Sequence, residues 1–180
     1  MKVYTSITEE QKSQLCVALG FFDGIHKGHR KVISETVKLK RLGLTPAVFT
    51  FEESPKSIIF KVKEKQITDN KAKKEKIESL GIEILYMIDF KKIMNFTPEQ
   101  FVEKILKEKL NAKYLVCGFN YHFGAGGIAD AKRLKEIAEK FEIKTKIVKP
   151  ILYKCVPVSS TRIREAIKNR DFSSANIMLK

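Results

Sequence analysis

The sequence predicts an α/β fold in which a parallel sheet of about five strands carries helices on both faces. Apolar runs of strand length alternate with amphipathic stretches of helical spacing along the chain. This alternation is typical of parallel sheets with helices packed on each side. The length of 180 residues and the hydrophobic content of 43% suffice for a domain with its own core. We therefore expect a single domain over residues 1–180.

The strands are predicted from short apolar runs, and the helices from helical spacing with capping signals. Strands are expected at residues 15–19, 45–51, 84–88, 114–117 and 144–148. Helices are expected at residues 27–42, 69–80, 97–110, 131–141, 159–168 and 172–179. Gly43 and Gly81 end two of these helices, and Thr97, Pro98 and Gln100 form a helix start. Residues 52–68 show no clear period, and we expect a long, mobile loop there.

Composition and charge restrict the function classes. The chain has no run of about 18 apolar residues and no signal-peptide core, so no membrane segment is expected. Cys16, Cys117 and Cys155 are interpreted as reduced thiols of a cytoplasmic protein. The net charge of +14 suggests an anionic partner such as a nucleotide or nucleic acid. Most lysines, however, are interleaved with glutamate as on solvated helix faces, so nucleic acid binding is not favoured.

The stretch GFFDGIHKGH follows the first predicted strand directly and opens a helix. Gly20 and Gly24 permit tight turns and the close approach of a ligand. His26 and His29 share one face of the helix start, beside backbone amides that favour anions. This pattern indicates a phosphate site better than a glycine turn with incidental histidines. Zinc is not favoured, because Asp23 could supply a third ligand only in principle and the spacing is not HExxH.

A second anion-binding cluster is predicted in the stretch VSSTRIRE. The hydroxyl groups of Ser159, Ser160 and Thr161 precede a helix, and Arg162 and Arg164 lie just inside it. Hydroxyls, arginines and free helix amides together bind phosphate well. The simpler alternative is a plain helix cap formed by Ser160 or Thr161.

The stretch GFNYHFGAGG follows the fourth predicted strand, and Asn120 in it offers both a donor and an acceptor. Gly124, Gly126 and Ala129 fit a G-x-G-x-x-A dinucleotide pattern. That interpretation is not favoured, because Lys149 follows the next strand where an acidic residue is needed. A glycine-rich loop over a ligand is the better interpretation, with a mobile surface loop as its alternative.

The stretch TFEESP ends the second predicted strand, where it could contact a ligand or serve only as a structural strand end. Its chemistry does not distinguish these two possibilities. The P-loop signature is absent from the sequence, which disfavours a P-loop kinase.

Together, GFFDGIHKGH, GFNYHFG and VSSTRIREAI resemble the adenylyltransferase module of bacterial bifunctional riboflavin kinase/FMN adenylyltransferases, the FAD synthetases. The resemblance covers nearly the whole chain and includes TPEQFVEKILKEKLNAKYLVCGF. It implies the Rossmann-like fold of the nucleotidyltransferases that carry an HxGH motif. It also implies transfer of AMP from ATP to FMN, giving FAD and pyrophosphate, with Mg²⁺ held mainly by the ATP phosphates. Positioning and charge neutralisation suffice for such a transfer.

The resemblance also implies roles for individual residues. His26 and His29 match the HxGH histidines, which bind ATP phosphates and stabilise the transition state. Asn120 and Arg162 are expected to act with them in catalysis. The expected ATP site comprises Gly20, Phe22, Asp23, Gly24, His26, Gly28, His29, Ser159, Ser160, Thr161, Arg162 and Arg164. The expected FMN site comprises Thr50, Phe51, Asn120 and Phe123.

The chain departs from the family pattern mainly on the acceptor side. The departures are Phe21, Ser54, His122, Gly127 and Ala129. ATP binding is therefore a firmer expectation than FMN as acceptor. Two alternatives stay open: a nucleotide- or flavin-binding protein with lost or altered catalysis, and a nucleotidyltransferase for another phosphate acceptor. No riboflavin kinase domain is expected within this chain, and the oligomeric state is not predicted.

Overall fold

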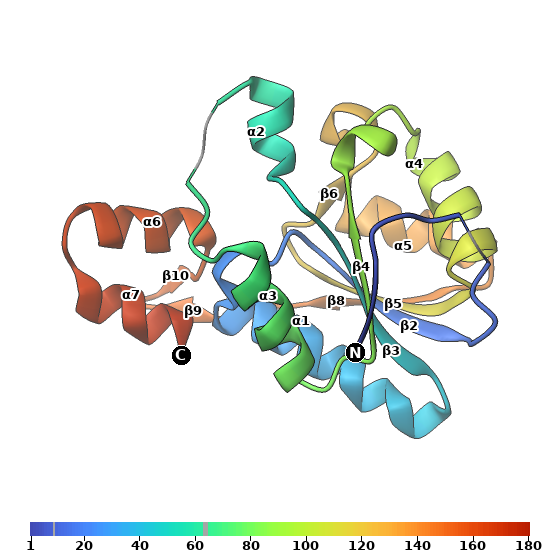
Figure 1. Ribbon diagram of the computed structural model, residues 1–180, viewed down its shortest axis with the longest axis horizontal. Helices are drawn as coiled ribbons and strands as arrows, with labels where there is room; N and C mark the ends of the chain where they lie inside the picture. Colours follow the sequence, from blue (N-terminus) through green and yellow to red (C-terminus); the bar gives the residue numbers. More distant parts are fainter. Residues whose placement is uncertain (9, 63–64) are drawn as a thin grey trace.

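The computed structural model describes residues 1–8, 10–62 and 65–180. Its centre is a sheet of six parallel strands in the order β1-β4-β3-β2-β5-β8 (Figure 1). They are β1 (Lys2–Tyr4), β2 (Leu15–Leu19), β3 (Thr45–Phe51), β4 (Ile84–Ile88), β5 (Ala112–Gly118) and β8 (Lys144–Val148). The predicted Rossmann-like α/β architecture is confirmed, with one more strand than expected.

The strand order reverses beside β2, the central strand. The chain proceeds from β2 to β3 and β4 on one side, then returns to place β5 and β8 on the other. In open parallel sheets, such a reversal leaves a crevice outside the carboxyl ends of the strands, where ligands bind. The fold therefore places its ligand crevice beside the ends of β2 and β5.

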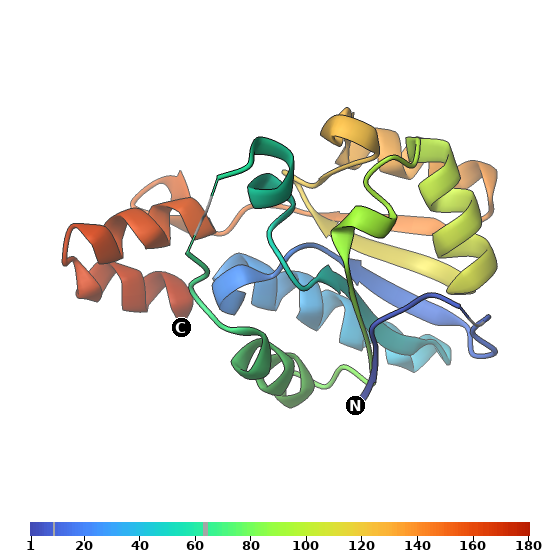
Figure 2. The ribbon, with the colours of Figure 1, turned by 45° about the horizontal axis from the view of Figure 1, so that its top comes forward.

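Helices cover both faces of the sheet and bury two separate cores (Figure 2). One face carries α1 (Lys27–Val37), its 3₁₀ continuation η2 (Lys38–Leu42) and α3 (Asn70–Ser79). The other face carries α4 (Pro98–Gln100), the π-helical stretch η4 (Phe101–Lys109) and α5 (Ala131–Lys140). Successive residues of a strand point to opposite faces, so Val17 joins the core under η4 while Cys16 joins the core under α1.

The predicted helix signals act where they were expected. Thr97 and Gln100 form a reciprocal capping box at the start of α4. The π-helical stretch ends where the Leu110 N–H donates to the Ile105 carbonyl, five residues back. Gly43 ends η2 in the left-handed conformation, with φ of 77°, which glycine adopts without strain.

Strand β1 and helix α2 (Pro55–Phe60) are among the elements that the sequence did not predict. Strand β1 pairs with β4 at the edge of the sheet, but its three residues are too few to show a strand pattern. The prediction of a loop over residues 52–68 is wrong at residues 55–60. These residues form the helix α2, which has a proline at its start. This helix buries none of its residues, so it lacks the apolar stripe that reveals a helix. Residues 63 and 64 of that predicted loop lie outside the described residues.

The C-terminal helices α6 (Ser160–Lys168) and α7 (Phe172–Leu179) stand beside the sheet, at the left of Figure 1. They share a small third core built on Val158, Ile163, Ala175 and Met178. A short hairpin of β9 (Leu152–Tyr153) and β10 (Val156–Pro157) connects β8 to α6. The hairpin and the small core bring the start of α6 back to the crevice.

Candidate active site

A cavity of about 630 Å³ opens at the carboxyl ends of β2, β3, β5 and β8. Its walls come from the segments after those strands and from the start of α6, so all four motifs of the sequence meet there. Of the predicted site residues, Gly20, Phe22, Asp23, His26, Gly28, His29, Phe51, Asn120, Phe123, Ser159, Ser160, Thr161 and Arg164 line it. Gly24, Thr50 and Arg162 do not line this cavity.

A tight turn connects β2 to α1 and aims the first motif into the cavity. Phe22 and Ile25 have positive φ values of 55° and 44°, and Gly24 has φ of 79°. Positive φ is strained for a bulky side chain, so surrounding contacts must hold this turn in place. Gly20 is required for close approach, because a Cβ there would lie 3.0 Å from the Phe22 ring.

The two histidines of the HxGH motif stack on each other at the start of α1. Their ring centroids are 3.6 Å apart with an angle of 18° between planes. The His29 backbone N–H donates to His26 Nδ1 over 3.3 Å, so His26 is also the N-cap of the helix. Because Nδ1 accepts this bond, the neutral ring carries its proton on Nε2. His26 therefore offers an N–H donor from its Nε2 atom.

Burial favours the neutral form of both imidazoles at pH 7. Burial lowers the pKa of His26 from 6.5 to about 4. Burial and the neighbouring His26 and Lys73 hold the pKa of His29 well below 6.5. A bound phosphate would raise both pKa values, because a nearby anion favours the protonated ring. The pair thus gains positive charge as negative charge arrives.

Asp23 ties the histidine turn to two other elements. Its Oδ1 accepts hydrogen bonds from the Ile67 and Thr68 backbone N–H groups, at 2.9 and 3.2 Å. Its Oδ2 forms a 2.8 Å ion pair with Arg164 of α6, and its carbonyl accepts a hydrogen bond from Ser160 Oγ. The carboxylate is buried and has protein partners on both oxygens, so Asp23 holds together the wall of the cavity that it lines.

The start of α6 is the second cluster of donors, and Ser159 rather than Ser160 or Thr161 caps it. Ser159 Oγ accepts the Arg162 N–H over 3.3 Å. The amides of Ser160 and Thr161 occupy the first turn, where no carbonyl inside the helix can pair with them. These amides are thus placed to bind an anion in the cavity, together with the backbone amides at the start of α1.

Arg162 points away from the cavity, into the β9–β10 hairpin. Its guanidinium donates to the carbonyls of Val156, Pro157 and Tyr153, at 2.8, 3.0 and 3.3 Å. Thr50 is likewise turned inward: it is buried, and its Oγ1 donates to the Phe21 carbonyl over 2.8 Å. In this structure both side chains hold the walls of the cavity, and their predicted roles at the ligand remain predictions.

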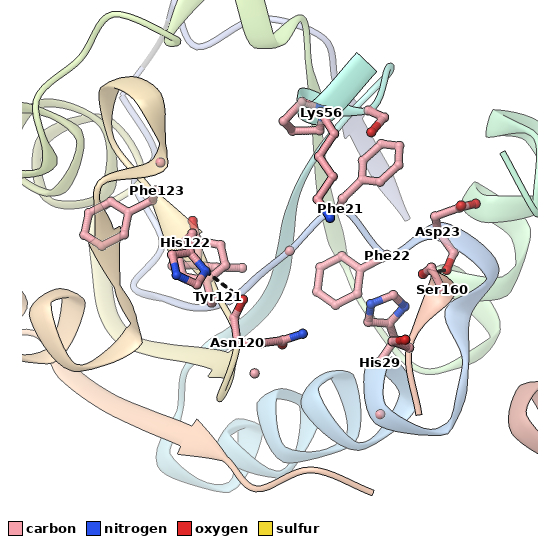
Figure 3. Close-up of a pocket in the computed structure, with 18 of the residues that line it drawn as sticks. Phe21, Phe22, Asp23, His29, Lys56, Asn120, Tyr121, His122, Phe123 and Ser160 are labelled. Atoms are coloured by element: carbon pink, nitrogen blue, oxygen red, sulfur yellow. Dashed lines mark hydrogen bonds between the residues drawn. The ribbon is translucent and has the colours of Figure 1, made fainter. Parts of the chain in front are cut away.

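The third motif forms the wall opposite the histidines, as Figure 3 shows for Asn120, Tyr121, His122 and Phe123. The His122 Nδ1 atom lies 3.1 Å from the Asn120 carbonyl, while the Tyr121 and Phe123 rings stack at 5.8 Å. Gly124 has φ of 77°, and a Cβ there would lie 2.7 Å from Pro98. The glycine is thus required for the loop to pack against α4.

The structure adds residues that the sequence reasoning missed. Lys56, Ile59 and Phe60 of α2 line the cavity, and Figure 3 shows the Lys56 side chain reaching into it. The signal that could have found them is Ser54-Pro55, a proline at the first position of a helix. Lys73 of α3 lies buried behind the cavity, and no local pattern distinguishes it from its solvated neighbours.

A family model described as FAD synthetase matches residues 8–162, most of the chain. The chain belongs to the FAD synthetase family. The family resemblance inferred from the three motifs is thereby confirmed.

Relatives in the FAD synthetase family match over nearly the whole chain. The bifunctional riboflavin kinase/FMN adenylyltransferase of Bacillus subtilis (strain 168) is 32% identical over 177 residues, covering 96% of this chain and 55% of the relative. The protein of the same name from Listeria monocytogenes serovar 1/2a is 33% identical over 168 residues, covering 91% of this chain and 52% of the relative. The chain therefore spans about half the length of the curated relatives it matches.

A solved structure from Streptococcus pneumoniae, described as a macrolide-efflux protein, is also similar to this chain. It is 31% identical with a TM-score of 0.87, covering 99% of this chain and 60% of that chain. None of the helices in the described part of the present chain is long and apolar enough to cross a membrane.

Proposed function

We propose that this member of the FAD synthetase family is an FMN adenylyltransferase, which transfers AMP from ATP to FMN and releases pyrophosphate. The observation that carries the proposal is the convergence of two helix starts and a stacked histidine pair on one cavity. Its volume of about 630 Å³ lies within the range of roughly 300–1,000 Å³ that is usual for ligand sites.

The chemistry needs no covalent intermediate on the protein. A phosphate oxygen of FMN attacks the α-phosphorus of ATP, and the bond from that phosphorus to the bridging oxygen breaks. The electron pair leaves with pyrophosphate, where negative charge accumulates. His26 Nε2–H, His29 and the first amides of α1 and α6 supply fixed donors for that charge.

The acceptor side of the cavity suits a flat aromatic ligand. Phe51, Ile59, Phe60 and Phe123 line the cavity, and an apolar ring system would bury its surface against such side chains. Lys56 reaches into the same space and could neutralise a phosphate. These features favour FMN as the acceptor, although Ser54 and His122 depart from the family pattern.

Magnesium fits this site as a companion of the triphosphate. No cluster of three or more metal-binding side chains occurs in residues 1–8, 10–62 and 65–180, and both Asp23 carboxylate oxygens already have protein partners. Phosphate oxygens would therefore be its main ligands. When bound, the ion neutralises phosphate charge. The three free cysteines suit the reducing cytoplasm that we propose as the location.

The test is to incubate the protein with ATP, Mg²⁺ and FMN and to measure FAD and pyrophosphate, with His29→Ala as the control. We expect both products in equal amounts. Absence of FAD above the control would overturn the proposal. Tight binding of ATP and FMN without product would then indicate a binding protein. Product with other phosphate acceptors, in a panel with ATP and CTP, would indicate a different transferase.

A further inference from the structure

Lys73 is a fully buried lysine directly behind the candidate active site. Its exposed fraction is 0%, although it lies on α3 among lysines that face solvent. Burying an ammonium group is costly unless its surroundings compensate it. A buried lysine at a site for anionic ligands therefore calls for a functional explanation.

The contacts of Lys73 lie on the two segments that form the cavity wall. Its Nζ donates to the Phe51 carbonyl over 3.3 Å, at the end of β3. The same Nζ lies 4.1 Å from the centre of the Phe21 ring, directly after β2, in the range of a cation–π interaction. Phe21 and Phe51 both line the cavity, so one ammonium group joins two of its walls.

Neighbouring polar side chains support the same strand end. The Glu52 carbonyl accepts hydrogen bonds from Gln66 Nε2 and Asn70 Nδ2, both at 3.2 Å. Those two donors are neutral amides, whereas Lys73 brings a charge. Two ionisable groups interact with this ammonium. The Asp23 carboxylate stabilises it, and the ammonium in turn disfavours protonation of His29. Burial lowers the pKa of Lys73 to about 8, so most of the population is still charged at pH 7.

We propose that Lys73 is a positioning residue for the transfer reaction. Its ammonium holds the Phe21 and Phe51 segments together and supplies a fixed positive charge behind the histidine pair. The charge acts through the wall of the cavity, on the ATP phosphates, without touching them. This inference rests on the proposed function for its substrates, but its contacts are independent of that function.

The test compares Lys73→Met with Lys76→Met, which removes the same charge from an exposed position on the same helix. Because the charge acts on the triphosphate before and during the reaction, the loss should appear mainly in KM for ATP. We expect kcat/KM to fall about tenfold in Lys73→Met and to stay near the wild-type value in Lys76→Met. The thermal unfolding temperature of Lys73→Met should change little, because removing a buried charge offsets the loss of the hydrogen bond to Phe51 and of the cation–π contact with Phe21. Equal kinetics in the two variants, or a loss of stability that parallels the loss of activity, would overturn the proposal.

Two measurements do not depend on turnover and separate this inference from the proposed function. In Lys73→Met, the pKa of His29 measured by NMR should rise, because a neighbouring positive charge is gone. In the wild-type chain, ATP binding should raise the pKa of Lys73, followed by NMR of labelled lysine. An unchanged His29 pKa or an unresponsive Lys73 would overturn the role of Lys73. Failure to form FAD while both shifts occur would instead overturn FMN as the acceptor.

Discussion

His26 performs two tasks with its two ring nitrogens. Nδ1 caps α1 by accepting the His29 N–H, while Nε2 keeps its proton. The hydrogen bond to Nδ1 fixes the orientation of the ring, because rotating the ring would break the helix cap. The Nε2 donor is therefore held in place without a further partner. Gly28 allows this arrangement, since a Cβ there would lie 3.1 Å from the His26 ring.

Substitutions can separate these two tasks. His26→Asn keeps a good capping residue but loses the Nε2 donor, so we expect unchanged stability and a rate reduced by about a hundredfold. His26→Ala should lose the rate and also about 1 kcal/mol of unfolding free energy. His29→Ala should lower the rate on the same scale. Steady-state kinetics and urea unfolding measure these effects, and a His26→Asn enzyme of wild-type rate would contradict the donor role.

The lowered histidine pKa values also predict how stability depends on pH. In the unfolded chain His26 has its ordinary pKa of 6.5, whereas in the folded chain its pKa is about 4. The unfolded state therefore binds more protons in that window, and stability falls as the pH falls through it. For His26 alone the loss approaches about 3 kcal/mol. Urea unfolding from about pH 7.5 to about pH 4 covers this window. In His26→Asn, the unfolding free energy should fall less steeply with decreasing pH than in the wild-type chain.

At the level of elements, α2 is a helix held beside the cavity without a core of its own. None of its residues is buried, yet Ile59 and Phe60 line the cavity. Apolar side chains that are unburied in the free protein gain contacts only when a ligand covers them. We infer that α2 contributes to binding much more than to folding.

This inference predicts different outcomes for two neighbouring positions. Ile59→Ser should leave the unfolding temperature unchanged and weaken FMN binding about tenfold, because one apolar contact is lost. Val62→Ser is the matched control, since Val62 is exposed but does not line the cavity. Quenching of FMN fluorescence measures both affinities. Equal affinities would show that α2 does not contact the flavin.

In the whole molecule, Asp23 is the point where three parts of the chain are joined. Its carboxylate holds the segment before α3 through two backbone amides, and α6 through Arg164. The small core of α6 and α7 is separate from the two cores of the sheet. These polar contacts thus help to fix the second anion cluster against the first.

Removing the charge of Asp23 should therefore loosen one region more than the rest. In Asp23→Asn we expect a loss of about 3 kcal/mol in unfolding free energy, as for other broken buried ion pairs. Amide hydrogen exchange should accelerate in α6 and α7 before it does in β2 and β5. Glu99→Gln is the control, because its ion pair with Arg133 is exposed. Uniform acceleration over all elements would contradict this picture.

The sequence by itself determined the alternating elements and the segments that meet at the cavity. Periods of about two and 3.6 residues and capping patterns are local properties of the chain. For that reason β2, α1 and the Thr97 capping box lie where they were predicted. Parallel strands then carry the following segments to one edge of the sheet, which explains why the distant histidine and serine motifs come together.

Only the tertiary structure decided which side chains face the cavity and which support it. Arg162 donates to hairpin carbonyls, Thr50 to the Phe21 carbonyl, and Lys73 is buried among solvated lysines. The direction and burial of such groups depend on partners from distant parts of the chain, which no local period contains. The short helix α2 was missed for a related reason, because it packs on no core that would impose an apolar stripe.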